Sequence, residues 1–269
     1  MTRGALIFAF NNQHTDYLTM AAWTARRVHR WLDIPVAVVT DVTDSDSLLT
    51  FDRVINAPAQ SGGGRWFSDY GTHVEWYNAG RPEAYDLTPW DHTLVMDSDY
   101  VVNSSQLNML FNAGHDFLCY RDCVDVTDPD QPFLKTFGKF NLPMWWATVM
   151  CFNKSNTSQY IFESMKMVRN NWQHYRDLYG ISETTYRNDY ALSIALGIVS
   201  GHVWKANNIP WPMMATMPEH QLDLQTAGTV DMWTINYQNI QSRPTKIALA
   251  GMDFHAMGKQ SLGEIIERS

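Results

Sequence analysis

Short apolar runs alternate with stretches of helical length through the first hundred residues. The runs predict strands because they are rich in β-branched and aromatic side chains, and they lie at 5–12, 34–41, 53–58 and 93–96. Helices are expected at 16–33 and around 69–84, and a Gly-rich loop, SGGGRWF, at 61–67. Strands joined by helices favour a mainly parallel sheet covered on both faces, with ligands bound outside the carboxyl ends of the strands.

The second half of the chain is less regular but continues the pattern. We expect strands at 116–121 and 146–152, then helices at 158–179 and 186–199, and two late strands with the sequences MWTINYQ and KIALAGMDF. No Gly/Ser- or Pro-rich stretch is typical of a linker. The sequence therefore predicts a single α/β domain over residues 1–269, with a mostly parallel, Rossmann-like central sheet flanked by helices.

Composition and charge narrow the function classes. The 269 residues are 45% hydrophobic, enough for an extensive core, and no apolar stretch approaches the ~18 residues of a membrane span. We therefore expect a cytoplasmic protein without a membrane anchor. The net charge of -8 gives no general attraction for nucleic acid or anionic membranes. A basic group at 26–30 is expected to form the solvated face of a helix.

Three cysteines leave at least one unpaired: Cys119, Cys123 and Cys151. The stretch CYRDC has no second ligand pair elsewhere, so buried thiols are favoured over a zinc site, and no disulfide is expected.

The sequence LVMDSDYVV places two acids, Asp97 and Asp99, one residue apart in an apolar run. Side chains two apart on a strand point to the same side, and two close carboxylates need a cation. Oxygen ligands suit Mg²⁺ or Mn²⁺, which commonly bridge carboxylates to the phosphates of a nucleotide. A turn or helix cap is the alternative for DSD followed by NSSQ. The flanking apolar residues favour the metal site.

The segment LTPWDHTLVMDSDYVV resembles the strand and metal motif of nucleotide-sugar glycosyltransferases with the GT-A fold, especially glycogenin-like enzymes. DFHAMGK (253–259) is similar to their carboxyl-terminal His-x-x-Gly…Lys element. The resemblance implies that His255 completes a metal site with Asp97 and Asp99, and that Lys259 contacts the diphosphate. Lys259 directly follows Gly258 instead of standing three residues beyond it, so its reach differs from the family pattern.

Two further positions follow from the same resemblance. Arg81 lies where these enzymes carry a basic residue before the metal motif, which suits it to stabilise the leaving diphosphate. YRNDY (186–190) is similar to the helix start that borders the donor sugar, which implies a catalytic or sugar-binding role for Asp189. Each residue also has a structural interpretation: His255 as a core histidine, Asp189 as a helix N-cap, and Lys259 and Arg81 as surface charges. Their occurrence together in the order of one family favours the joint site.

The implied activity is transfer of a hexosyl or pentosyl group from a nucleoside diphosphate sugar, a UDP-sugar by the resemblance, with Mn²⁺ or Mg²⁺ as cofactor. Residues 1–102 would form the nucleotide-binding half, and 103–269 the acceptor half with the carboxyl-terminal metal and phosphate element. Retention of the anomeric configuration is expected, as in glycogenin-like enzymes. The residues expected to bind the donor nucleotide, beside Arg81, Lys259 and the two aspartates, are Phe10, Asn11, Asn12, Asp41 and Ser98.

The acceptor is not fixed by these motifs. WWATVMCF, YRNDYALSIAL and DFHAMGK also resemble glycosyltransferases of large tailed phages, some of which modify 5-hydroxymethylcytosine in DNA, which would place the enzyme in the host cytoplasm. Arg65 and Trp66 in the Gly-rich loop would then form a platform for an extruded base. A glycan, lipid-linked sugar or protein acceptor stays open. Alternatives of another class are a metal-dependent nucleotidyltransferase and a non-enzymatic nucleotide-sugar-binding module.

Overall fold

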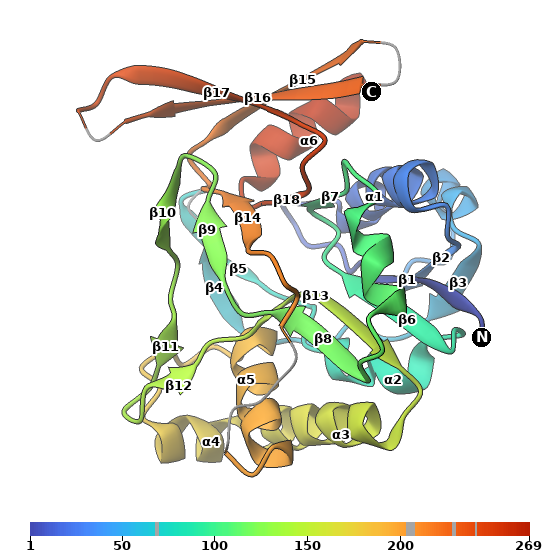
Figure 1. Ribbon diagram of the computed structural model, residues 1–269, viewed down its shortest axis with the longest axis vertical. Coiled ribbons are helices and arrows are strands. Elements are labelled where there is room, and N and C mark those ends of the chain that lie inside the picture. Colours follow the sequence, from blue (N-terminus) through green and yellow to red (C-terminus); the bar gives the residue numbers. More distant parts are fainter. Residues whose placement is uncertain (68–69, 203–207, 228–229, 240) are drawn as a thin grey trace.

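The computed structural model describes residues 1–67, 70–202, 208–227, 230–239 and 241–269, and it contains a central six-stranded sheet (Figure 1). The strand order is β3 (Arg53–Asn56), β2 (Val36–Thr40), β1 (Arg3–Phe8), β6 (His92–Met96), β13 (Trp146–Asn153) and β8 (Phe117–Tyr120). The first four strands are parallel, and β13 is antiparallel to both its neighbours. The predicted α/β class and mostly parallel central sheet are confirmed.

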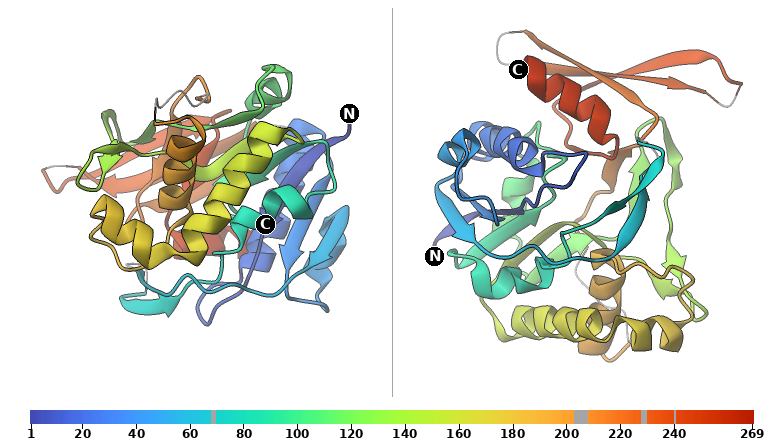
Figure 2. Two further views of the ribbon diagram at one scale, coloured as in Figure 1. Left: turned by 90° about the horizontal axis from the view of Figure 1, so that it is seen from below. Right: turned by 180° about the vertical axis from the view of Figure 1, so that it is seen from behind.

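The sheet is buried on both faces because its strands are apolar throughout. In β1, Ala5 and Ile7 belong to one core cluster, while Leu6 and Phe8 belong to the other. The first cluster includes side chains of α1 (Tyr17–Leu32), and the second includes side chains of α3 (Asn156–Asn170) and α5 (Asn188–Val199). Figure 2 shows α3 and α5 lying together, away from α1. This is the two-faced covering that continuous apolar strands require.

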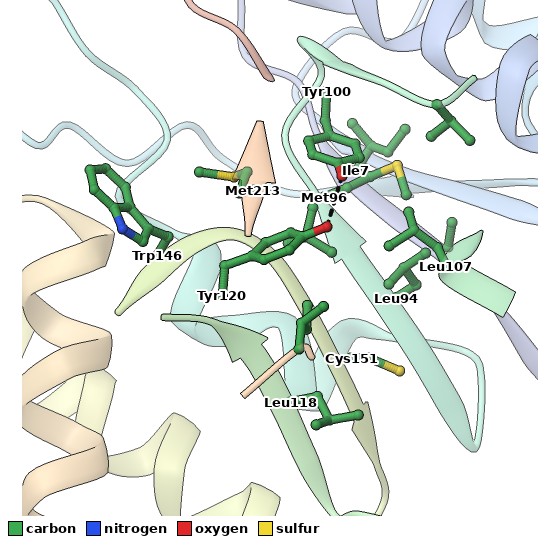
Figure 3. Packing of buried hydrophobic residues seen from close by; sticks show 14 of the residues in the cluster. Ile7, Leu94, Met96, Tyr100, Leu107, Leu118, Tyr120, Trp146, Cys151 and Met213 are labelled. Carbon is green, nitrogen blue, oxygen red and sulfur yellow. Dashed lines mark hydrogen bonds between the residues drawn. The ribbon is translucent and has the colours of Figure 1, made fainter. Parts of the chain in front are cut away.

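A pair of tyrosines lies in the first cluster, where the central sheet meets a second one (Figure 3). The hydroxyls of Tyr100 and Tyr120 are 2.9 Å apart and hydrogen-bonded, and the indole nitrogen of Trp211 donates to Tyr120 at 3.1 Å. Polar tips buried in an apolar core need such partners. All three cysteines are buried free thiols, as predicted.

The second sheet has five short strands and contributes one wall of the site described below. Its order is β10 (Asp128–Pro132), β9 (Cys123–Asp125), β14 (Met213–Thr216), β18 (Phe254–Ala256) and β7 (Tyr100–Val101). The other sheets are two hairpins and a three-stranded meander: β4 (Gly64–Phe67) with β5 (Thr72–Glu75), β11 (Thr136–Phe137) with β12 (Leu142–Pro143), and β15 (Gln221–Ala227), β16 (Val230–Gln238) and β17 (Pro244–Ala250).

The remaining helical segments are short or lie at the end of the chain. They are η1 (Asp46–Thr50), η2 (Arg81–Glu83), α2 (Ala84–Leu87), η3 (Gln106–Asn112), α4 (Trp172–Tyr179) and α6 (Lys259–Arg268). The meander of β15, β16 and β17 lies across α6 at one end of the molecule (Figure 1). The expected helix at 158–179 is two helices, because α3 ends at Asn170 and α4 begins at Trp172, with Asn171 between them.

The helix expected around 69–84 was wrong for most of its described part, because β5 lies at Thr72–Glu75 and helical structure begins only at Arg81, with η2. Residues of the Gly-rich loop form β4, which pairs with β5 in an antiparallel hairpin. Gly71 takes a positive φ of 60° between these strands, a conformation that glycine adopts without strain. The β-branched and aromatic side chains of THVE and GRWF, which favour strands, therefore outweighed the apparent helical length.

The basic group on α1 is only partly solvated, which corrects the expectation of an exposed face. Arg27 is buried: its Nε donates to the Val102 carbonyl oxygen at 2.8 Å, and its Nη1 lies 2.9 Å from Asp231 of β16. Arg30 also contacts Asp231, at 3.2 Å, and the Thr226 hydroxyl donates to the Asp231 carboxylate at 3.0 Å. This cluster joins α1 to the meander.

Replacing Asp231 by Asn is expected to lower the free energy of unfolding by about 3 kcal/mol at pH 7, because the variant leaves the Arg27 charge buried and unpaired. Burial opposes ionisation of Asp231, yet Arg27 and Arg30 hold the pKa of its carboxyl below its ordinary value. Its contribution is therefore present above the unfolded pKa of about 4 and is lost as the pH falls through the lower folded pKa. Urea titrations of both proteins at several pH values measure this, and equal stability at pH 7 would contradict it.

Candidate functional site

A cavity opens where β1 and β6 end and the second sheet begins. Its walls come from the ends of β1, β6 and β13, the hairpin of β4 and β5, the start of α5, and the segment from β18 to α6. The predicted site residues on its lining are Phe10, Arg81, Asp97, Ser98, Asp99, Asp189, His255 and Lys259. Ligand cavities at the carboxyl ends of parallel strands are common in α/β proteins.

Asp97, Ser98 and Asp99 form a turn between β6 and β7, rather than part of one strand. The backbone N–H of Tyr100 donates to the Asp97 carbonyl oxygen at 3.2 Å, which closes the turn. The Thr24 hydroxyl of α1 donates to the Ser98 carbonyl oxygen at 2.6 Å and anchors it. The turn alternative was therefore correct for the backbone. It does not compete with a metal site, because both acids still face the cavity.

His255 reaches the two acids through strand pairing. It lies on β18 opposite Tyr100 of β7, so the register places it beside residues 156 positions earlier in the chain. Its Nε2 is 3.2 Å from Asp99 Oδ2 and 4.0 Å from Asp97 Oδ2. One potential ligand atom from each of the three residues lies within 4.8 Å of the other two.

Each of the two acids forms an ion pair with a different cation. The Arg81 guanidinium, only 2% exposed, forms an ion pair with Asp97 and donates to the Ala147 carbonyl oxygen at 2.8 Å. The Lys259 ammonium forms an ion pair with Asp99. Burial opposes ionisation of Asp97, but Arg81, His255 and Lys259 hold the pKa of its carboxyl below the ordinary value. Asp97 is therefore a carboxylate at neutral pH.

The three residues fit a divalent metal ion of the Mg²⁺ or Mn²⁺ class. Two carboxylates and an imidazole are the donor types that Mn²⁺ accepts, and carboxylates are the main protein ligands of Mg²⁺. Burial lowers the pKa of His255, which favours the neutral imidazole that can bind a metal. Its Nδ1 is buried with no hydrogen-bond partner among the described residues. A histidine that only filled the core would be expected to have its ring nitrogens hydrogen-bonded, so this favours a functional role over a structural one.

Asp189 lies in the first turn of α5, where it joins that helix to β13. Its Oδ1 accepts a hydrogen bond from the Ala147 backbone N–H at 2.9 Å, and its Oδ2 pairs with Arg187 at 2.9 Å. The structural alternative of an N-cap is not what the structure has, because Arg187 occupies the cap position. Asp189 is thus held rigidly at the cavity wall by the residues it contacts.

Three predicted nucleotide contacts lie off the cavity lining, and two of them have local partners instead. The Asn11 side-chain oxygen accepts from the Leu18 backbone N–H at 2.9 Å. The Asn12 side-chain oxygen accepts from the backbone N–H groups of His14 and Thr15, both at 2.9 Å, as in an Asx turn. Asp41 is exposed directly after β2. Among the described residues, the cavity brings together the other eight predicted positions without these three.

Sequence reasoning misread the hairpin that borders the cavity. Arg65 and Trp66 are neighbours on β4, so their side chains point to opposite faces. Arg65 lines the cavity, while Trp66 is 61% exposed. The Arg65 guanidinium instead lies 3.6 Å from the ring centroid of Trp76. The two-residue platform proposed from the sequence is therefore not formed, and the alternation of GRWF was the signal that could have revealed it.

Comparison with known proteins finds distant likeness to glycosyltransferases, the class that the motifs resemble. No family model and no curated protein matches the chain. Among solved structures, galactosyltransferase LgtC with donor and acceptor sugar analogs is 14% identical over 73% of this chain and 70% of its own, with a TM-score of 0.47. Streptococcus pneumoniae TIGR4 GlyE is 13% identical over 78% of this chain, with a TM-score of 0.44. Mouse xyloside xylosyltransferase 1 is 14% identical over 76% of this chain, with a TM-score of 0.43.

The extents of these similarities differ. The chain spans 46% of the GlyE chain and 84% of the xylosyltransferase. None of the helices in the described part of this chain is long and apolar enough to cross a membrane. At these identities and TM-scores, the function proposed next depends on the chemistry of the cavity itself.

Proposed function

We propose that this protein is a metal-dependent glycosyltransferase of the GT-A type, which moves a sugar from a UDP-sugar to an acceptor hydroxyl. The observation that carries the proposal is the meeting of Asp97, Asp99 and His255 with two cations at the carboxyl end of a parallel sheet. This set can bind a metal ion and a diphosphate together. The residues 1–102 supply the nucleotide side, and 103–269 the acceptor side and the metal and phosphate element.

Several residues together stabilise the negative charge that develops on the departing diphosphate. Asp97, Asp99 and His255 hold the ion, which when bound supplies positive charge to the diphosphate. Arg81 is fixed by the Ala147 carbonyl oxygen and aims its guanidinium at the same place. Lys259, at the first position of α6, adds an ammonium that is paired with Asp99. Donors aimed at developing negative charge are among the largest contributions to catalysis.

Asp189 acts on the sugar side. Its position at the start of α5, on the same cavity as the metal residues, supports a contact with donor-sugar hydroxyls or with the reacting carbon. Phe10 and Ser98 border the nucleoside side, whereas Asn11 and Asn12 contribute by shaping the loop after β1 rather than from the lining, and Asp41 lies off the lining. Retention of the anomeric configuration follows from the resemblance to glycogenin-like enzymes.

The nature of the acceptor is a separate proposal. We infer 5-hydroxymethylcytosine in DNA, within a phage-infected host cytoplasm, from the similarity to tailed-phage enzymes. The loss of the Arg65–Trp66 platform removes one argument for it, and the charge of -8 confines DNA contacts to a few cations. Glycan, lipid-linked or protein acceptors are the competing outcomes.

One experiment tests donor and acceptor together. Calorimetry with Mn²⁺ and a panel of nucleoside diphosphate sugars is expected to give the tightest binding for a uridine donor. The preferred donor is then incubated with 5-hydroxymethylcytosine DNA, unmodified DNA and simple glycans, and the products are analysed by mass spectrometry. A sugar-sized mass gain on the hydroxymethylated nucleoside alone supports the DNA acceptor. Transfer only to a glycan contradicts the DNA acceptor and keeps the glycosyltransferase.

The same experiment separates the rival classes. Given a nucleoside diphosphate sugar, a nucleotidyltransferase would transfer the nucleotide to the acceptor and release sugar phosphate, whereas a binding module would consume neither donor nor acceptor. Preference for guanosine or cytidine diphosphate would contradict the uridine assignment.

A further inference from the structure

The charged side chains of the cavity are unevenly matched. Its lining contains four permanent cations and three carboxylates among the described residues. Each carboxylate forms an ion pair with a different cation, and the pairs are Arg81–Asp97, Lys259–Asp99 and Arg187–Asp189. Arg65 is the fourth cation. Within the part of the chain that the structure describes, no carboxylate lies within 4.0 Å of its guanidinium.

Arg65 is held in place by groups that do not neutralise it. Its guanidinium stacks on Trp76, and its Nη2 donates to the Tyr186 carbonyl oxygen at 3.1 Å. Its Nε is buried with no hydrogen-bond partner among the described residues. Burial and the nearby Arg187 lower the pKa of Arg65 to about 9, so it stays protonated at neutral pH. An immobilised guanidinium with unused donors is arranged to bind a ligand.

The donor alone does not supply the missing negative charge. The two charges of a nucleoside diphosphate sugar and the two of a divalent metal ion cancel when they enter together. The three ion pairs are already balanced, so among the described residues of the lining Arg65 remains the cation without a carboxylate partner when the donor is bound. A buried or half-buried cation of this kind is costly without an anionic partner.

We propose that Arg65 binds an oxyanion group of the substrate, a carboxylate or a phosphodiester, in addition to the diphosphate. This inference depends on the proposed function, because it concerns a substrate in the same cavity. The planar fork of arginine suits both groups, since each offers two oxygens to parallel N–H donors. The oxyanion belongs either to the transferred sugar, as in a uronic acid donor, or to the acceptor.

The test compares wild type with Arg65→Gln, which removes the charge but keeps much of the side-chain length, and with Arg65→Lys, which keeps the charge without the fork. Arg53→Gln on β3 is the matched control, because Arg53 is exposed and does not line the cavity. Titration calorimetry with Mn²⁺ measures the affinity for UDP-glucose and UDP-glucuronate. Protein saturated with UDP-glucose and Mn²⁺ is then titrated with glucuronate and with a dinucleotide monophosphate.

A donor oxyanion predicts that wild type prefers UDP-glucuronate and that Arg65→Gln weakens its binding about 10-fold, with UDP-glucose unchanged. An acceptor oxyanion predicts equal affinity for both donors, and an equivalent loss in Arg65→Gln for glucuronate or the dinucleotide. Arg65→Lys is expected to fall between Arg65→Gln and wild type, and Arg53→Gln to match wild type.

Failure of this inference and failure of the proposed function give different results. If Arg65→Gln binds every probe as wild type does, or loses UDP-glucose binding equally, the oxyanion assignment is overturned while Mn²⁺-dependent UDP binding stands. If wild type does not bind UDP with Mn²⁺, the proposed function fails. The dinucleotide titration of unloaded protein then decides about Arg65: a loss in Arg65→Gln supports oxyanion binding, and no difference overturns it.

Discussion

Replacing Asp99 by Asn is expected to abolish Mn²⁺-dependent binding of UDP while the protein remains folded. Asp99 is 4% exposed, and its carboxylate contacts both Lys259 and His255. Asparagine has nearly the same shape but no charge, so the variant removes a metal ligand and leaves Lys259 without its anion. Because removing one member of a buried charge pair is costly, we expect the affinity for UDP to fall at least about 100-fold.

Titration calorimetry with and without Mn²⁺ measures the effect, and thermal unfolding by circular dichroism checks the fold. Asp44→Asn is the matched control, since Asp44 is exposed in the loop before η1. Unchanged UDP affinity in folded Asp99→Asn would remove Asp99 from the metal site. Equal losses in Asp44→Asn would show that the effect is not specific to the cavity.

Arg81→Met is expected to lower the rate of UDP release from the donor about 100-fold, because it removes a fixed donor from the leaving diphosphate. It should also destabilise the protein by about 3 kcal/mol, since the Asp97 carboxylate loses its buried partner. The two effects must be separated before the rate is interpreted.

The double variant Arg81→Met with Asp97→Asn separates them. Removing both charges should recover most of the stability measured by urea denaturation, because no unpaired carboxylate remains. Activity should not recover, since both side chains are placed in the leaving-group machinery. An Arg81→Met enzyme with wild-type turnover would contradict this role, and recovery of turnover in the double variant would show that the single loss came from misfolding.

Local pattern predicted the central sheet because its strands are short, apolar runs with helical stretches between them. β2 lies within its expected range, β6 begins one residue before its range, and β1 begins two residues before its range. The hairpin at 64–75 was missed because its signal is weak alternation beside several glycines. The break at Asn171 also has no strong local signal, as neither Pro nor Gly marks it.

The candidate site depended on long-range register that no local pattern contains. The acid pair was visible as a motif, but its meeting with His255 required the pairing of β7 with β18. His255 was included only because the motifs follow the order seen in the glycosyltransferase family that the sequence resembles. The positions of Asn11 and Asn12 could have been predicted differently, because Asn12 followed by Gln-His-Thr is typical of an Asx turn. The position of Arg65 on the cavity lining could not be predicted without the hairpin of β4 and β5.

The most direct test of the account is the location of Mn²⁺ and UDP in crystals of the protein grown with both. The account predicts one anomalous manganese peak among Asp97, Asp99 and His255, with the diphosphate beside it and within reach of Arg81 and Lys259. A manganese peak elsewhere, or UDP bound in the cavity with no metal at these three residues, would contradict it.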